Sequence, residues 1–289
     1  MTFQTLTTIA LTLFVAFKDV HAVTPSPGCG QNQASGTVSS TTTVNGKRRS
    51  YITNVPANYN SSNPYRLIFM FHGWGNSASA VANGQQGFLP FMGLPPLANG
   101  EGDPIGAISV APEGLNSAWA NSGGEDIAFV DQMIKEIESR LCIDQNLRFS
   151  TGFSYGASMS YAIACARAKQ FRAVAIISGA KLSGCDDGGR RDPIAFYGQH
   201  GSSDGTIPIA SGKQLRDTFV ANNGCTKQTV VDAAAGSGAM VKTQYQGCKK
   251  GFPVTWVSFD GGHTSTPTTR GAAKSFTPDE TWVFFRQFT

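Results

Sequence analysis

Six short apolar runs constrain the fold of this chain more than any other feature of its sequence. Most of these runs are continuous rather than alternating, and Gly or Pro follows each one within a few residues. Continuous apolar runs are typical of strands that are covered on both faces, as in parallel sheets. The runs lie at 67–71, 105–111, 147–151, 173–178, 194–197 and 254–259. The sequence therefore predicts a central, mostly parallel sheet.

Helical patterns fill the segments between these runs. Ser122 and Glu125 have the spacing of a capping box, and apolar residues then recur at helical spacing to form one face. The members of that face are Ile127, Val130, Ile134, Ile137 and Leu141. A closing helix is expected to begin near Pro278 and to run through Trp282, Phe285 and Phe288. Strands that alternate with helices predict a single α/β domain with helices flanking the sheet.

The first 22 residues have the pattern of a signal peptide. The apolar run at 6–17 is too short to span a bilayer, and Val20 and Ala22 place small residues where a signal peptidase cleaves. We therefore expect a signal peptide at 1–22, one folded domain at 23–289, and secretion to the extracellular space. All six Cys follow the expected cleavage point, as in a compartment where thiols pair. Asn60 begins the sequence Asn-Ser-Ser and is a predicted glycosylation site.

Charge and ligand patterns argue against several function classes. The formal net charge of +4 is scattered, and the longest basic run covers only 47–49, so nucleic acid is not an expected partner. No apolar stretch after the leader has the length of a membrane helix. The chain contains no C-x-x-C motif and no His/Cys cluster with zinc-ligand spacing, so no metal is expected.

Ser154 is the predicted nucleophile. It occupies the centre of a Gly-x-Ser-x-Gly motif at 152–156, and Ser203 occupies the centre of a second match at 201–205. A nucleophile elbow requires a strand before the serine and a helix after it. Only Ser154 has both, because Pro208 and further Gly follow Ser203. Ser203 is interpreted as an ordinary turn residue.

His263 is the predicted general base. A serine hydroxyl needs an imidazole to take its proton and a carboxylate to orient that imidazole. In α/β-hydrolases these residues follow the chain order Ser, acid, His. His72 precedes the serine and His200 precedes the expected acid, whereas His263 follows the run at 254–259. Chain order therefore selects His263.

Asp204 is the predicted acid, because it follows the run at 194–197 in a turn at the carboxyl end of the sheet, where active-site loops gather. Asp260 is its rival, but it lies only three residues from His263 on the same loop. Asp186 and Asp187 would lie one strand earlier.

Two backbone N–H groups are expected to form the oxyanion hole. One comes from Tyr155, the residue after the nucleophile, and the other from the loop that follows the run at 67–71. In that loop Gly73 allows close approach, and Trp74 is the predicted donor. His72 is expected to brace the loop with its side chain.

With these residues assembled, the chain resembles the fungal feruloyl esterases of types C and D. These belong to the first carbohydrate esterase family and are related to polyhydroxybutyrate depolymerases. The resemblance spans nearly the whole chain after the leader. The segments that carry it are 26–30, 111–121, 124–126, 141–144, 152–156, 178–179, 183–185, 200–204, 222–225, 247–248 and 260–263.

The resemblance implies an α/β-hydrolase fold and a secreted serine carboxylesterase. Its expected substrate is a feruloyl ester of plant cell-wall arabinoxylan or a small hydroxycinnamate ester, hydrolysed through an acyl-enzyme without a cofactor. The implied triad is again Ser154, Asp204 and His263. Ala157 departs from the family, in which relatives often have Gly, and the segment at Gly73 varies among relatives.

Three other functions stay open at this stage. Related enzymes with the same triad deacetylate xylan or depolymerise polyesters. A hydrolase fold that has lost catalysis could instead bind carbohydrate, although such chains usually lose a triad member.

Trp74 and Trp119 are the candidate substrate-binding residues. Both follow predicted strands at the active-site end of the sheet, and an indole can pack against a phenolic ring.

Six cysteines can pair in 15 ways, and topology narrows the choice. Cys142 precedes the strand that leads to the nucleophile, and Cys165 lies about 16 Å down the helix that follows it. Both are therefore expected at the same end of the sheet. Two more cysteines bracket a Gly- and Ala-rich excursion, which leaves the last two to tie down the N-terminal arm. The predicted bridges are Cys142–Cys165, Cys225–Cys248 and Cys29–Cys185.

Overall fold

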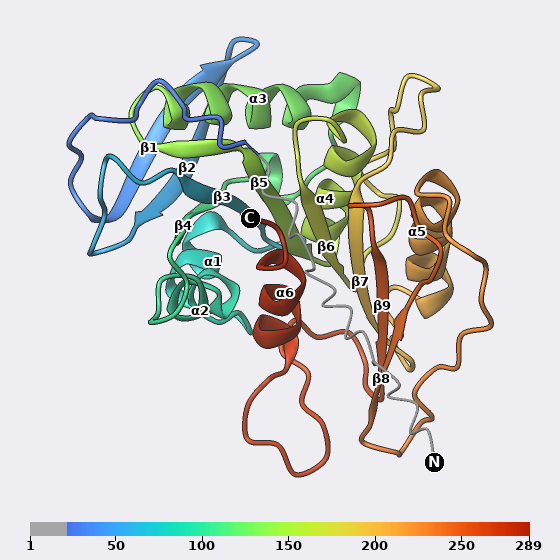
Figure 1. Ribbon diagram of the computed structural model, residues 1–289. Coiled ribbons are helices and arrows are strands. Elements are labelled where there is room, and N and C mark those ends of the chain that lie inside the picture. The colour runs from blue at the N-terminus through green and yellow to red at the C-terminus, as the bar shows by residue number, and fades with distance from the viewer. Residues whose placement is uncertain (1–21) are drawn as a thin grey trace, which may run out of the picture.

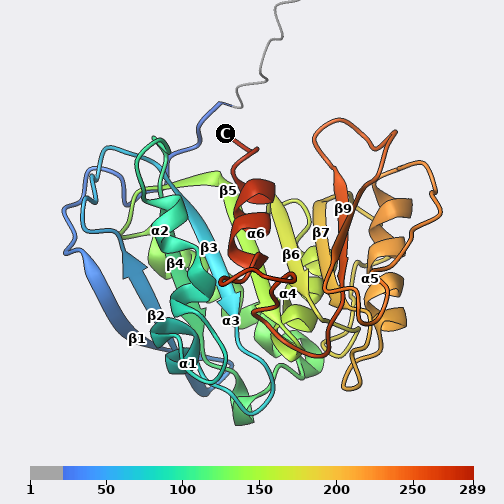
Figure 2. The same ribbon diagram turned by 90° about the horizontal axis from the view of Figure 1, so that it is seen from below.

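The computed structural model describes residues 22–289. The predicted signal peptide therefore lies outside the described residues, except for its last residue. The order of strands across the sheet is β1-β2-β4-β3-β5-β6-β7-β9-β8. In Figure 2 the labelled strands cross the molecule from β1 on the left to β9 on the right.

The six predicted strands are confirmed. They are β3 (Tyr65–Phe71), β4 (Ala107–Pro112), β5 (Ile143–Phe153), β6 (Ala173–Ile177), β7 (Ala195–Gly201) and β9 (Val254–Phe259). Neighbouring strands of this set all pair in parallel. Every residue of β3 and of β9 is buried, as expected for continuous apolar strands covered on both faces. The mostly parallel α/β sheet predicted from the sequence is therefore present.

Three antiparallel strands extend this sheet at its edges. β1 (Gly36–Val44) and β2 (Lys47–Val55) form a hairpin that joins β4, and β8 (Met240–Gln244) pairs with β9. The hairpin turns through Asn45 and Gly46, both with positive φ, which is the signature of a two-residue type I′ turn. β1 is largely exposed and rich in Ser and Thr, so it carries no apolar run by which it could be predicted.

Helices cover both faces of the sheet. α3 (Glu125–Glu138), α4 (Tyr155–Ala166) and α5 (Ile209–Asn222) pack into one hydrophobic cluster, and α1 (Ala78–Asn83), α2 (Pro95–Ala98) and α6 (Thr277–Phe285) pack into the other. In Figure 1, α6 passes in front of the central strands. Alternate residues of β3 enter the two clusters, so the sheet separates two cores.

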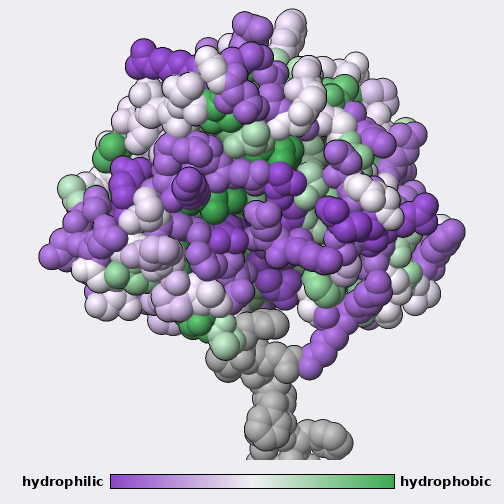
Figure 3. Space-filling model, turned by 90° about the horizontal axis from the view of Figure 1, so that it is seen from above, coloured by the Kyte–Doolittle hydropathy of each residue, from purple (hydrophilic) through white to green (hydrophobic). Residues whose placement is uncertain are grey.

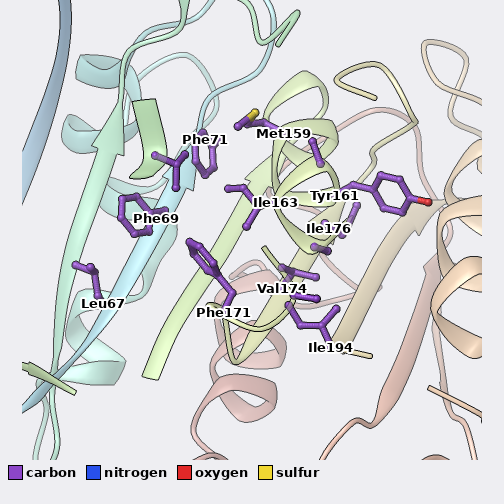
Figure 4. Packing of buried hydrophobic residues seen from close by; sticks show 14 of the residues in the cluster. Leu67, Phe69, Phe71, Met159, Tyr161, Ile163, Phe171, Val174, Ile176 and Ile194 are labelled. Atoms are coloured by element: carbon purple, nitrogen blue, oxygen red, sulfur yellow. The ribbon is translucent and has the colours of Figure 1, made fainter. Parts of the chain in front are cut away.

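The core under α4 is the larger of the two. Figure 4 shows Phe69 and Phe71 of β3 and Ile176 of β6 beside Met159 and Ile163 of α4. None of these side chains is more than 2% exposed. Full burial of one such side chain contributes about 1.5–3 kcal/mol. This packing fixes α4 against the sheet, and it thereby fixes the turn that precedes α4.

The predicted apolar face of α3 is confirmed, whereas its capping box is wrong. Ser122 lies in the short 3-10 helix η3 (Ser122–Gly124), and its side chain makes no cap hydrogen bond. The amide oxygen of Asn121 instead accepts hydrogen bonds from the backbone N–H groups of Asp126 and Ile127, both at 3.1 Å. An Asn side chain thus satisfies two of the free N–H groups at this helix start.

One disulfide prediction is confirmed and two are wrong. Cys225 bonds Cys248 as expected, but the other bridges are Cys29–Cys142 and Cys165–Cys185. The N-terminal arm runs along the start of β5, where the N–H of Ser26 donates to the Ile143 carbonyl at 2.8 Å. This path brings Cys29 beside Cys142.

The path of the loop after β6 explains why Cys185 bonds Cys165. The backbone N–H of Ala180 donates to Ser158 Oγ of α4 at 3.3 Å, so the loop returns along that helix. This path brings Cys185 to Cys165 at the end of α4. The prediction failed because it placed the cysteines by their height on the sheet and did not account for the paths of these two segments.

No helix within residues 22–289 combines the length and apolar character needed to cross a bilayer. On the face shown in Figure 3, hydrophilic residues predominate and the hydrophobic ones form small, separate patches.

Candidate active site

The turn between β5 and α4 holds Ser154 in a strained backbone conformation. Its φ and ψ are 59° and −119°, outside the common regions for a residue with a side chain. A Cβ at Gly152 would lie 2.4 Å from the Gly156 backbone, and a Cβ at Gly156 would lie 2.1 Å from the carbonyl oxygen of Phe71. Both glycines of the motif are therefore sterically required. Strain of this kind is typical of functional turns.

The three side chains selected from the sequence lie in one hydrogen-bonded chain. His263 Nε2 is 2.8 Å from Ser154 Oγ, and His263 Nδ1 is 2.7 Å from Asp204 Oδ2. A carboxylate can only accept, so Nδ1 carries the proton and Nε2 accepts the serine O–H. The Asp204 side chain is fully buried, and that of His263 is 16% exposed. This is the arrangement by which an imidazole activates a serine hydroxyl.

The turn after β7 fixes the carboxylate of Asp204. Its Oδ1 accepts the backbone N–H groups of Thr206 and Ile207 at 2.9 and 2.8 Å, and its Oδ2 faces His263. Backbone donors of this kind stabilise the ionised form of a buried carboxylate. Asp204 is therefore held as an acceptor aimed at the imidazole.

The rival carboxylates are engaged in other contacts. Asp260 accepts the backbone N–H groups of Gly236 and Gly238, at 3.0 and 2.6 Å, and so closes the loop before β8. Asp186 and Asp187 each accept a backbone N–H two residues further along their own turn. None of these three carboxylates contacts His263.

His263 lies on the long loop that joins β9 to α6, at the bottom of Figure 1. Its ring packs over that of Phe153, with centroids 4.6 Å apart. Ser265 Oγ donates to the carbonyl of Gly87 at 2.7 Å and ties this loop to the segment after α1. Phe153 was not recognised from the sequence, although its place beside the nucleophile in the Gly-x-Ser-x-Gly motif was the available signal.

The loop after β3 lies against the nucleophile. A Cβ at Gly73 would be 3.5 Å from the Ser154 Cβ. His72 is fully buried behind this loop, where its Nδ1 donates to the Gly73 carbonyl at 2.7 Å and its Nε2 accepts the Gly114 N–H at 3.0 Å. The expected bracing role of His72 is confirmed. Burial lowers the pKa of His72 from 6.5 to about 4, so the ring is neutral near neutral pH.

Two backbone donors are available beside Ser154. Over residues 22–289, the N–H groups of Trp74 and Tyr155 donate to no protein acceptor. Tyr155 begins α4, so its N–H is one of the free donors at a helix start. Trp74 follows Gly73 in the loop that touches the nucleophile. Their assignment to the oxyanion hole stays a prediction.

The two candidate tryptophans have different environments. Trp119 is fully buried, and its Nε1 donates to the His72 carbonyl at 2.9 Å. It also packs edge-on against Phe71. Its assignment to substrate binding is therefore wrong, because no face of the indole is open to a ligand. Trp74 is 75% exposed and stays a candidate.

The serine of the second Gly-x-Ser-x-Gly match precedes the catalytic acid, but among residues 22–289 its Oγ forms no hydrogen bond with a histidine. Ser203 is exposed in the turn after β7, and its backbone N–H donates to the Gly261 carbonyl at 3.0 Å. In the described chain, no cluster of three or more His, Cys, Asp or Glu residues could hold a metal ion.

Ala157 departs from the expected family pattern without disturbing the site. Its side chain is fully buried, and a Cβ at Gly179 would lie 2.8 Å from the Ala157 Cβ. The missing side chain at Gly179 thus provides the room that the extra methyl group of Ala157 occupies.

Comparison with known proteins identifies close relatives. No family model matches the chain. It is 46% identical to feruloyl esterase D of Neurospora crassa, with 98% of this chain and 97% of that protein covered. It is 44% identical to feruloyl esterase C of Emericella nidulans, with 95% and 96% covered.

Solved structures show the same fold at low sequence identity. The acetyl xylan esterase from Aspergillus awamori superposes with a TM-score of 0.63 at 15% identity, covering 86% of this chain and 99% of that one. A feruloyl esterase module from Clostridium thermocellum, complexed with sinapinate, gives a TM-score of 0.57 at 16% identity, covering 86% and 90%. These similarities show an α/β-hydrolase fold, as predicted.

Proposed function

This chain belongs to the family of fungal feruloyl esterases C and D, and from that premise we propose how its residues hydrolyse an ester and which ester they act on. The enzyme is a carboxylic-ester hydrolase. The observation that carries the proposal is the hydrogen-bonded chain from Ser154 through His263 to Asp204. On this proposal residues 23–289 form the catalytic domain.

Acylation begins when Ser154 Oγ attacks the ester carbonyl carbon and its proton passes to His263 Nε2. The carbonyl oxygen becomes an oxyanion, and the N–H groups of Trp74 and Tyr155 stabilise it. Asp204 stabilises the imidazolium that forms and holds its ring in place. The intermediate then collapses: the bond to the alcohol oxygen breaks, and that oxygen takes the proton from His263. An acyl-serine remains.

Deacylation repeats these steps with water as the nucleophile. His263 takes a proton from the water, the resulting oxygen attacks the acyl carbon, and Ser154 leaves with the proton returned by His263. The products are the free acid and the original enzyme. Each step balances with these residues and water alone, so no cofactor is required. We expect full activity after treatment with a chelator.

The proposed substrate is a hydroxycinnamate ester, such as ferulate esterified to arabinose on plant cell-wall xylan. Trp74 supports this proposal because its indole is 75% exposed on the loop that touches the nucleophile. An exposed aromatic side chain at this place offers a flat apolar surface to a phenolic ring. The peptide N–H of the same residue is the proposed oxyanion donor, so replacement of the side chain leaves the donor in place.

Secretion is part of the proposal. The three disulfides of the described chain are typical of an oxidising compartment. Asn60 is exposed, as a glycosylation site must be.

Product release from two esters tests the substrate class. Ferulate release from methyl ferulate is measured beside acetate release from acetylated xylan, with Ser154→Ala as the inactive control. We expect ferulate release to dominate and Ser154→Ala to reduce kcat by about four to six orders of magnitude. Acetate release that exceeded ferulate release would instead assign the enzyme to xylan deacetylation.

A second comparison tests Trp74. Trp74→Ala should lower kcat/KM for methyl ferulate about tenfold more than for an acetate ester, because only ferulate carries a ring. Leu182→Ala is the matched control, since Leu182 is also an exposed apolar residue and lies on the loop after β6. Equal losses on both esters would remove Trp74 from the phenolic site.

A further inference from the structure

His200 is a buried histidine beside the acid of the triad, and the mechanism above gives it no role. It lies on β7, is 1% exposed, and pairs in register with Ser258 of β9. Its Nε2 is 2.8 Å from the carbonyl oxygen of Ile207 and 3.4 Å from Asp204 Oδ2. A carbonyl oxygen can only accept, so Nε2 carries the ring proton.

His200 and Asp204 hold opposite sides of the same residue. Asp204 Oδ1 accepts the Ile207 N–H at 2.8 Å, and His200 donates to the Ile207 carbonyl. The turn between the end of β7 and the start of α5 is therefore closed by two side chains, one of which is the catalytic acid. The other oxygen of that acid, Oδ2, accepts the N–H of His263 at 2.7 Å. A shift of Ile207 would thus displace the carboxylate that orients the imidazole.

The surroundings of His200 allow its ring little movement. A Cβ at Gly212 of α5 would lie 2.3 Å from His200 Nδ1, so the helix backbone packs directly on the ring. The ring stacks on Trp256 of β9, with centroids 6.3 Å apart. No protein group among residues 22–289 accepts a hydrogen bond from Nδ1, so a second ring proton would be unsatisfied.

The charged groups near His200 come from three elements. Asp204 lies on its own turn, His263 lies beyond Asp204, and Arg216 of α5 lies over Trp256 at 5.1 Å from the ring centroid. Burial lowers the pKa of His200 and the neighbouring His263 acts in the same direction, whereas the hydrogen bond to the Ile207 carbonyl and the charge of Asp204 oppose them. The neutral Nε2–H form is thus the one that fits this site.

We propose that His200 is a positioning residue for the catalytic acid: it fixes the Ile207 carbonyl and thereby holds Asp204 in line with His263. The role rests on the proposed triad, because it acts only through Asp204. It assigns a contribution to catalysis to a residue that contacts neither the substrate nor the nucleophile.

Two substitutions at His200 separate the effect of its hydrogen-bond donor from the effect of its side-chain volume. His200→Gln places an amide N–H where it can reach the Ile207 carbonyl, whereas His200→Met fills similar space and leaves that carbonyl without a donor. We expect His200→Gln to keep kcat within about threefold of the unchanged enzyme. His200→Met should lower kcat about 10–100-fold with KM nearly unchanged, the scale of a misplaced catalytic group. Ser203→Ala, in the same turn, is the control and should change neither constant.

Three readouts distinguish positioning from a general structural effect. All rates are expressed per active site, counted by titration with a fluorophosphonate, so unfolded protein does not contribute. The acid limb of kcat/KM should move to lower pH in His200→Met, because a displaced Asp204 stabilises the imidazolium less. In an Asp204→Asn background, His200→Met should lower kcat by less than twofold, because the group it positions is already impaired.

A second variant tests the same proposal if His200→Met does not fold. Gly212→Ala pushes on the His200 ring from α5, and it should lower kcat in the unchanged enzyme but not in Asp204→Asn. The proposal is wrong if kcat per active site is unchanged in His200→Met. It is also wrong if His200→Met lowers kcat by the same factor in the Asp204→Asn background as in the unchanged enzyme. Failure of the proposed function gives different results, because either Ser154→Ala would then retain activity or acetate release would exceed ferulate release.

Discussion

Burial of His72 should make the stability of this enzyme fall as the solution is acidified. Its pKa is lowered from 6.5 to about 4, because the effect of burying the ring outweighs that of the hydrogen bond to the Gly73 carbonyl, which acts in the opposite direction. The unfolded chain therefore binds a proton near pH 6.5, whereas the folded chain does so only near pH 4. The stability contributed by the neutral ring is complete above pH 6.5 and is lost as the pH falls from 6.5 towards 4. At 1.36 kcal/mol for each unit of pKa, the loss is about 3 kcal/mol.

Urea unfolding at pH 7.5 and pH 4.5, followed by circular dichroism with the disulfides intact, measures this contribution of His72 to stability. His72→Gln lacks the titrating ring, so its free energy of unfolding should depend less on pH than that of the unchanged enzyme. Between pH 7.5 and pH 4.5, the free energy of unfolding of the unchanged enzyme should fall by about 2–3 kcal/mol more than that of His72→Gln. Carboxylates that titrate in both proteins cancel in the comparison.

Trp119→Phe provides the matched control. It removes the hydrogen bond that the indole donates to the His72 carbonyl and disturbs the same loop, but it changes no titrating group. We expect lower stability at every pH and an unchanged slope. If His72→Gln retained the pH dependence of the unchanged enzyme, the ring would not be the titrating group, and the reasoning from its burial would be refuted.

Three further outcomes follow from the structure. Gly156→Ala should abolish activity and reduce stability, because the new Cβ would lie 2.1 Å from a carbonyl oxygen of β3. Gly205→Ala is the control: its new Cβ would have no atom within 4 Å, so activity and thermal unfolding should not change. Ser203→Ala should retain full esterase activity, and a loss as deep as that of the nucleophile variant would mean that the wrong serine was selected. Replacing both Cys29 and Cys142 with Ala should lower the unfolding free energy by about 4–5 kcal/mol, since the bridge spans 113 residues.

The predictions that succeeded rest on local patterns. The strand and the helix that flank Ser154 are adjacent to it in the chain, so the elbow could be identified without knowledge of distant contacts. Asp204 and His263 were found because chain order and the common edge of a parallel sheet fix where active-site loops gather. The observed distances of 2.7 and 2.8 Å agree with that selection.

The predictions that failed depend on the paths of loops. Cys29 reaches Cys142 because the N-terminal arm forms backbone hydrogen bonds with the start of β5, which no spacing in the sequence reveals. Trp119 follows a strand at the active-site end, but its loop turns inward and buries the indole behind His72. The relation of His200 to Ile207 requires side-chain geometry, because it joins residues across a turn.

The central claim is that Ser154 attacks the ester with His263 as its base. The most direct test is covalent labelling by a fluorophosphonate, followed by mass mapping of the modified peptide. The account predicts one adduct per chain, located on Ser154, absent in Ser154→Ala and formed far more slowly in His263→Ala. An adduct on Ser203, or labelling of Ser154 at an unchanged rate without His263, would contradict it.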